Sequence, residues 1–184
     1  MGGIQMSSRL LRCLSLSFLF VVPISVAHGQ QPQTRQGFWF NGGFGYGSLG
    51  CQDCDGRASG LSGGLSLGGT LSQKVLLGVG TTGWYKSESG ATLTVGTVDA
   101  RARLYTSSTT GFFLTAGVGV GTISADVAGL GSGSETGVGV VLGLGYDIRI
   151  GTNVSLTPFW NGFAIKSSNT DANVWQIGLS ITAH

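Results

Sequence analysis

The chain has 184 residues, of which only 10% are Asp, Glu, Lys or Arg. The length allows one domain and is too short for two ordinary ones, and the charged fraction is far below the roughly 25–35% that a soluble surface normally carries. The ten Lys and Arg residues nearly balance the eight Asp and Glu residues and are scattered along the chain, so we expect no nucleic-acid partner.

Residues 1–29 have the layout of a secretory signal peptide. Arg9 and Arg12 precede an apolar run over residues 14–26, and small residues then lead to a cleavage site before Gln30. The apolar run is shorter than the roughly 20 residues that a membrane-spanning helix needs. We therefore predict an exported protein, with residues 30–36 as a flexible leader and residues 37–184 as the folded domain.

From Phe38 onward, large apolar residues alternate with small or polar ones, and this period of two is typical of β-strands. Eight such segments are separated by turn signals: Phe38 to Ser48, Ala58 to Leu71, Val75 to Lys86, Ala91 to Tyr105, Phe112 to Gly121, Val138 to Ile150, Val154 to Ile165 and Val174 to Ala183. Connections after the second, fourth and sixth segments are predicted to be tight. Those after the first and seventh, and especially the glycine- and serine-rich stretch 129–134 after the fifth, are predicted to be longer.

The seventh segment contains Pro158. Proline cannot donate a hydrogen bond to a β-ladder, so we expect a bulge or another irregularity at this position.

The sixth segment indicates which face of the strands is apolar. Leu142 and Leu144 alternate with Gly143 and Gly145, so one face of the strand is apolar and the other is glycine. In a half-buried strand of a soluble protein, the face opposite the apolar one usually carries charge. The pattern favours the inverse arrangement, with the leucines facing lipid and the glycines lining a barrel interior. On this hypothesis a serine at Gly143 is expected to be mild.

An even number of strands can close into a barrel, which removes the unpaired edges that lipid does not tolerate. The predicted fold is all-β, an eight-stranded antiparallel up-and-down transmembrane β-barrel. Aromatic residues gather near the predicted strand ends, where two interfacial girdles are expected. They are Phe38, Tyr46, Tyr85, Tyr105, Phe112, Tyr146 and Trp160.

Residues 37–184 resemble the small eight-stranded outer-membrane β-barrel proteins of the opacity-protein and OmpA-like transmembrane-domain type. The resemblance is carried by the opening FWFNGGFGY (38–46), the glycine-alternating hairpins and the ending VWQIGLSITAH (174–184). It implies a porin-like monomer in the outer membrane of a Gram-negative cell envelope, with lipid and the outer-membrane assembly machinery as partners. Members commonly end in an aromatic residue, whereas this chain ends in His184.

Five charged residues share the inward phase of the fourth and sixth segments: Asp99, Arg101, Arg103, Asp147 and Arg149. Charges in a lipid-surrounded barrel must face the lumen and be paired. Because eight strands leave room for side chains rather than for a wide pore, we interpret these residues as an electrostatic plug of the lumen. A gate in a narrow transport pore is the alternative.

Cys51 and Cys54 form a Cys-x-x-Cys motif between the first two segments. A local disulfide is the favoured interpretation for an exported chain, because no second cysteine pair or nearby histidine completes a zinc site. A weak calcium contact at Asp53 and Asp55 is a lesser alternative. With the leader in the periplasm, Cys51, Glu88, Ser132 and Asn169 are expected on the cell exterior.

No enzyme activity, cofactor or metal is predicted. Removal of the signal peptide leaves His184, the last residue, as the chain's one histidine, so a histidine-assisted nucleophile system of the kind used by hydrolases is disfavoured. A structural or surface-interaction role is the main functional hypothesis. The alternatives are the narrow transport pore and a secreted, soluble, lipocalin-like binder of an apolar ligand.

Overall fold

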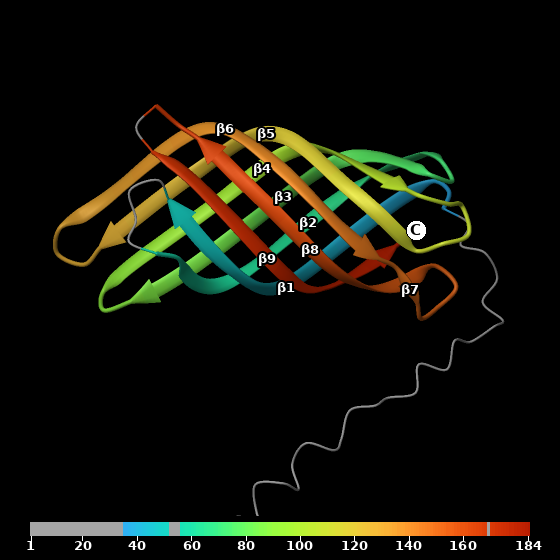
Figure 1. Cartoon of the computed structure of the whole chain (residues 1–184), viewed down its shortest axis with the longest axis horizontal. Coiled ribbons are helices and arrows are strands. Elements are labelled where there is room, and N and C mark those ends of the chain that lie inside the picture. Colours follow the sequence, from blue (N-terminus) through green and yellow to red (C-terminus); the bar gives the residue numbers. More distant parts are fainter. Residues whose placement is uncertain (1–34, 52–55, 169) are drawn as a thin grey trace, which may run out of the picture. The chain divides into compact units, whose positions relative to one another are not determined.

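The computed structural model describes residues 35–51, 56–168 and 170–184. Its described part forms a single antiparallel sheet in the order β6-β5-β4-β3-β2-β1-β9-β8-β7, and β6 also pairs with β8, which closes the sheet into a barrel (Figure 1). The strands are β1 (Phe38–Cys51), β2 (Ala58–Ser72), β3 (Val75–Glu88), β4 (Ala91–Tyr105), β5 (Phe112–Val127), β6 (Gly131–Tyr146), β7 (Ile148–Arg149), β8 (Val154–Lys166) and β9 (Asp171–Ala183).

The short β7 is a continuation of β6, so the barrel has eight strands, as predicted. β6 pairs with β8 as far as Gly145 opposite Phe159, and the same register resumes at Ile148 opposite Leu156. The interruption lies beside Pro158, whose nitrogen has no hydrogen to donate to the ladder. The irregularity predicted at this proline is therefore confirmed.

The strands are staggered around the barrel. A path that starts at Phe40 and passes from each residue to its partner on the next strand goes once around the barrel. It returns to β1 at Gly50, ten residues farther along. A closed sheet with such a stagger must tilt its strands, typically by about 40° from the barrel axis. Both properties are typical of a narrow barrel whose interior is filled by side chains.

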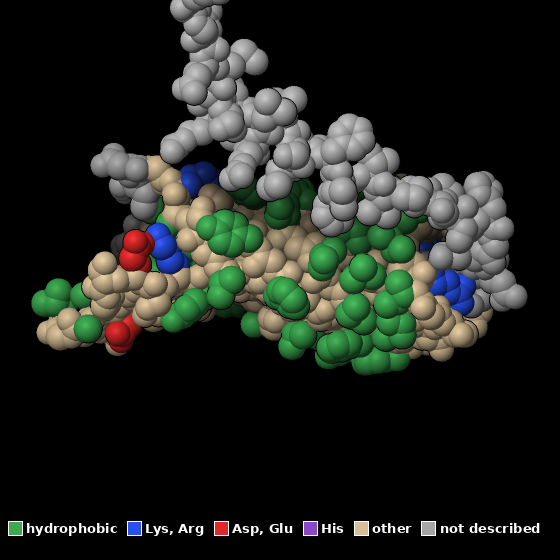
Figure 2. Space-filling model, turned by 90° about the horizontal axis from the view of Figure 1, so that it is seen from below, with side chains coloured by type: hydrophobic (Ala, Val, Ile, Leu, Met, Phe, Trp, Pro, Cys, Tyr) green, Lys and Arg blue, Asp and Glu red, His purple; other side chains and the backbone are tan. Residues whose placement is uncertain are grey.

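Apolar side chains form a band around the outside of the barrel. Figure 2 shows one face of the molecule, on which many of them are exposed. The band extends over eight residue-to-residue steps of β6, from Tyr146 to Val138, and over ten such steps of β2, from Leu71 to Leu61. At about 3.3 Å per residue and a tilt of about 40°, this corresponds to a height of roughly 20–25 Å. Beyond the band the outward residues become polar, as at Ser87, Thr94, Thr122, Thr136, Lys166 and Asn173.

The predicted strand phase is confirmed, because Leu142 is 63% exposed on the outside while Gly143 and Gly145 face inward. The prediction that serine at Gly143 is mild is wrong. A Cβ atom there would overlap Asn161 Oδ1 and the Trp160 carbonyl oxygen, since Asn161 is the residue paired with Gly143 on the neighbouring strand β8 and fills the space in front of it.

Exposed aromatic residues occur at both edges of the band. Phe112 lies opposite Tyr146 in the register, and Tyr46 and Tyr85 flank Leu61 at the other edge. Tyr105, which we expected in a girdle, is instead 4% exposed and points inward. Along β4, alternate residues point to the same side of the sheet. Tyr105 is two residues after the inward-pointing Arg103, so its side chain also points inward.

The predicted loop lengths are partly wrong. Residues 131–134 of the glycine- and serine-rich stretch after β5 are strand, with Asp126 opposite Ser132, and only residues 128–130 connect β5 to β6. Gly129 and Gly131 have φ values of 80° and 103°, so they supply the left-handed backbone of a tight turn. The connection after β4, predicted to be tight, spans residues 106–111.

The interior has three layers. One apolar cluster lies towards the end of the barrel that carries residues 89–90 and 128–130, here called the distal end. It comprises Leu49, Trp84, Val95, Val141, Phe163, Ile165, Ala172 and Val174. A smaller cluster lies at the opposite, proximal end and comprises Trp39, Leu76, Tyr105 and Phe113. Between them the inward residues are mostly polar, and this polar layer is the candidate site.

Candidate functional site: the polar layer inside the barrel

The polar layer contains a buried ion pair on β4. Arg101 donates from Nε to Asp99 Oδ1 at 2.8 Å and from Nη2 to Asp99 Oδ2 at 2.7 Å. The two residues are two positions apart, so the strand points both side chains into the lumen. Arg101 Nη2 also donates to Thr82 Oγ1 at 2.8 Å, which links the pair to β3. The bidentate geometry makes this the most strongly defined charged contact of the layer.

Arg103, two residues farther along β4, is equally buried but differently surrounded. Its guanidinium carbon lies 4.9 Å from the centre of a Trp39 ring and 4.6 Å from the Phe113 ring centre. Its Nε and Nη1 atoms have no hydrogen-bond partner in the described part of the chain. The aromatic rings stabilise the cation, but they leave these two N–H groups without an acceptor.

Asp147 anchors the proximal side of the layer. It accepts hydrogen bonds from the Tyr105 hydroxyl at 2.7 Å and from Thr157 Oγ1 at 2.6 Å. His184 Nε2 lies 3.8 Å from Asp147 Oδ2, and the His184 backbone N–H donates to the Asn153 carbonyl at 2.9 Å. The last residue of the chain is therefore tucked into the proximal end of the barrel.

Arg35 lies in the segment 30–36 that we predicted as a flexible leader, yet its side chain is only 1% exposed. Its Nη2 donates to the Thr110 carbonyl at 2.6 Å, and its Nη1 donates to the Gln73 carbonyl at 3.2 Å. The guanidinium carbon also lies 3.4 Å from the centre of the Tyr105 ring. Sequence reasoning missed this residue because an arginine in a polar segment gives no periodic signal.

The structure thus brings together four of the five charged residues predicted for the lumen, in two groups. Asp99 pairs with Arg101, while Arg103 and Asp147 lie near Tyr105 on the proximal side. Arg149 instead donates to the carbonyls of Gly151 and Thr152 in the turn between β7 and β8. It shares the inward phase but is the last residue of β7, at the proximal rim of the barrel.

The Cys-x-x-Cys motif is only partly described. Cys51 is the last residue of β1, whereas Gln52, Asp53, Cys54 and Asp55 lie outside the described residues. The Cys51–Cys54 disulfide and the calcium contact therefore stay predictions. Asn169, expected on the cell exterior, also lies outside the described residues.

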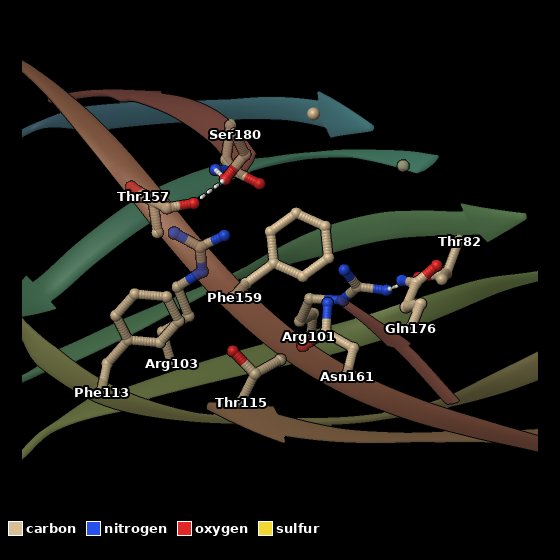
Figure 3. Close-up of a pocket in the computed structure, with 13 residues that line it drawn as sticks. Thr82, Arg101, Arg103, Phe113, Thr115, Thr157, Phe159, Asn161, Gln176 and Ser180 are labelled. Atoms are coloured by element: carbon tan, nitrogen blue, oxygen red, sulfur yellow. Dashed lines mark hydrogen bonds between the residues drawn. The ribbon is translucent and has the colours of Figure 1, made fainter. Parts of the chain in front are cut away.

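A small cavity of about 30 Å³ remains within the polar layer. Its lining includes both buried arginines, Arg101 and Arg103, together with hydroxyl, amide and aromatic side chains such as Thr115, Asn161 and Phe159 (Figure 3). This space is about that of one or two water molecules. Among the described residues, no group of three or more His, Cys, Asp and Glu side chains lies close enough together to hold a metal ion.

Within the described ranges, no helix has the length and apolar character needed to cross a membrane.

Comparison with solved structures finds the same fold in bacterial surface proteins. Neisserial surface protein A (NspA) is 18% identical with a TM-score of 0.60, over 79% of this chain and 96% of its own. Ail, the attachment invasion locus protein of Yersinia pestis, is 12% identical with a TM-score of 0.62, over 81% of this chain and 99% of its own. That Ail structure is a complex with the heparin analogue sucrose octasulfate.

These similarities concern the fold: a closed, eight-stranded antiparallel barrel. The resemblance to small outer-membrane barrels that the sequence indicated is confirmed at this level. No family model and no curated protein matches the chain.

Proposed function

We propose that this chain is a non-enzymatic, integral β-barrel protein of the bacterial outer membrane, exported by a cleaved signal peptide and monomeric in the lipid. The observation that carries this proposal is the continuous outward band of apolar side chains, bounded by aromatic residues at both edges. An apolar band about 25 Å tall is what a lipid bilayer requires of a barrel. A soluble protein rarely exposes so large a contiguous apolar surface.

We further propose that the lumen does not conduct. The Asp99–Arg101 pair is supplemented by two apolar clusters, one at each end of the polar layer. Trp84 and Phe163 in the distal cluster and Trp39 in the proximal cluster are at most 2% exposed. The plug that this arrangement supports is thus apolar as well as electrostatic.

The distal end is the part that we propose to act at the cell surface. β5 and β6 extend past the apolar band as a paired hairpin whose outward residues include Ser124, Asp126, Ser132 and Ser134. A structural or surface-interaction role is in keeping with this hairpin and with the names of NspA, a surface protein, and Ail, an attachment protein.

Membrane fractionation combined with gel migration of unboiled and boiled samples tests the location. The chain should fractionate with the outer membrane and migrate differently before and after boiling, because a closed barrel in detergent stays folded until it is heated. Recovery of a folded, detergent-free monomer from the soluble fraction would favour the lipocalin-like alternative.

Planar-bilayer recording tests the closed lumen. The refolded barrel should show no steady conductance, while a variant with both Trp84→Ala and Phe163→Ala should open measurable current if these side chains close the distal half. Steady conductance by the unmodified barrel would favour the narrow transport pore.

A further inference from the structure

The cavity in the polar layer has an uneven charge. Arg101 and Arg103 both line it, and no carboxylate is among its lining residues, which otherwise carry neutral hydroxyl, amide, glycine or aromatic groups. The two buried carboxylates lie behind this lining and have donors of their own. Asp99 is held by Arg101, and Asp147 accepts hydrogen bonds from Tyr105 and Thr157.

Arg103 has donor groups that the protein leaves unused. Its side chain is 4% exposed, and neither Nε nor Nη1 has a hydrogen-bond partner among the described residues. Trp39 and Phe113 lie near the guanidinium, but a ring face cannot replace an oxygen or anion in the guanidinium plane. Buried N–H groups without an acceptor, above all on a cation, are strongly destabilising. An acceptor in the cavity would remove this cost.

We propose that the cavity binds one small monovalent anion, of halide size, with the Arg103 guanidinium as its main donor group. The volume of about 30 Å³ accommodates one or two particles of about the size of water, which excludes a sugar, a nucleotide or a lipid headgroup. An anion is favoured over water alone because it offsets the positive charge of Arg103 and also accepts hydrogen bonds from its free donors.

Figure 3 shows how the site is built. The Arg103 guanidinium, which comes from β4, lies among Phe113 of β5 and Thr157 and Phe159 of β8. The Thr115 hydroxyl, which also lines the cavity, can turn its hydrogen towards an anion. This proposal concerns the barrel interior and holds whether or not the barrel acts at the cell surface.

Bromide provides a direct test because it is a halide that scatters anomalously. The full chain is refolded in sodium bromide and crystallised, and an anomalous peak is expected within hydrogen-bonding reach of Arg103 Nε or Nη1. Ordered water at this place with no bromide peak would overturn the proposal, and this result needs no variant that might fail to fold.

Thermal unfolding tests the same site in solution. At equal ionic strength, bromide or chloride should raise the unfolding midpoint by about 3 °C over gluconate, which is too large for the cavity, once the halide exceeds its dissociation constant tenfold. Arg103→Met should abolish this difference, and Arg149→Met should keep it because Arg149 bonds to turn carbonyls. An equal halide response in Arg103→Met would refute the assignment.

The bilayer experiment above separates this proposal from the closed lumen. A bromide peak at Arg103 in a barrel without current supports both proposals. A bromide peak in a barrel that conducts steadily supports the anion site and refutes the closed lumen.

Discussion

Replacing Leu142 by arginine places a charge near the middle of the apolar band. Leu142 is 63% exposed on the outside of β6 and lies midway between Tyr146 and Val138, which mark the edges of the band on that strand. A charged side chain at the lipid-facing midplane of a barrel costs about 2–4 kcal/mol, and the cost falls towards the interfaces. We therefore expect Leu142→Arg to lower the free energy of unfolding by this amount.

The neighbouring residue supplies a matched comparison from the opposite face. Gly143 points inward, where a Cβ atom would overlap the Asn161 side chain and the Trp160 carbonyl. Forcing atoms into such a packed interior costs about 1–3 kcal/mol. Gly143→Ser should thus also destabilise the barrel, but for a steric reason that does not depend on lipid.

Urea-dependent unfolding in lipid vesicles and in short-chain detergent micelles distinguishes the two effects. The penalty of Leu142→Arg should be larger in vesicles than in micelles, in which a charged side chain reaches water more easily, whereas that of Gly143→Ser should be similar in both. Equal stability of Leu142→Arg and the unmodified chain in vesicles would refute the outward, lipid-facing assignment of this strand.

Three further predictions concern the interior and the distal loop. Arg101→Ala should destabilise the barrel by about 3–5 kcal/mol because it leaves Asp99 as an uncompensated buried charge. Arg149→Ala, the control, should have little effect. Equal unfolding midpoints in urea for the two variants would contradict the Asp99–Arg101 pairing. Tyr105→Phe removes the hydroxyl that donates to Asp147 Oδ2 and should lower the free energy of unfolding by about 1–3 kcal/mol, measured in the same assay. An unfolding midpoint equal to that of the unmodified chain would show that this bond contributes nothing to stability. The double variant Cys51→Ser and Cys54→Ser should still insert and resist heat, because so short a disulfide loop contributes only about 2 kcal/mol; two free thiols in unreduced protein, found by mass spectrometry, would contradict the disulfide.

Strand phase was the part of the fold that the sequence predicts best. A period of two determines which side chains share a face, and Leu142 and Gly143 lie on the faces expected. Tyr105 shows the limit of composition as a guide. An aromatic residue near a strand end is typical of a girdle, but its phase on β4 directs it inward, where it donates to Asp147.

Loop lengths and charge partners were harder to predict. The stretch 129–134 has the composition of a loop, yet a β-ladder needs only backbone groups, so glycine and serine continue the pairing of β5 with β6. Phase also does not determine height along the barrel axis. Arg103 and Arg149 are both in inward phase, but the first is buried at 4% exposure and the second bonds to turn carbonyls.

The break between β6 and β7 lies beside Asp147, at the proximal end of the site. Pro158 interrupts the ladder to β6, whereas on the other side of the strand the Asp147 N–H donates to the Gly111 carbonyl at 3.0 Å and so continues the register in which Phe112 lies opposite Tyr146. The Asp147 carboxylate then meets Thr157 from β8 and Tyr105 from β4. The continued pairing with β5 therefore helps to place a carboxylate among its donors, and Arg103, which has no such partner at Nε and Nη1, is left beside the cavity.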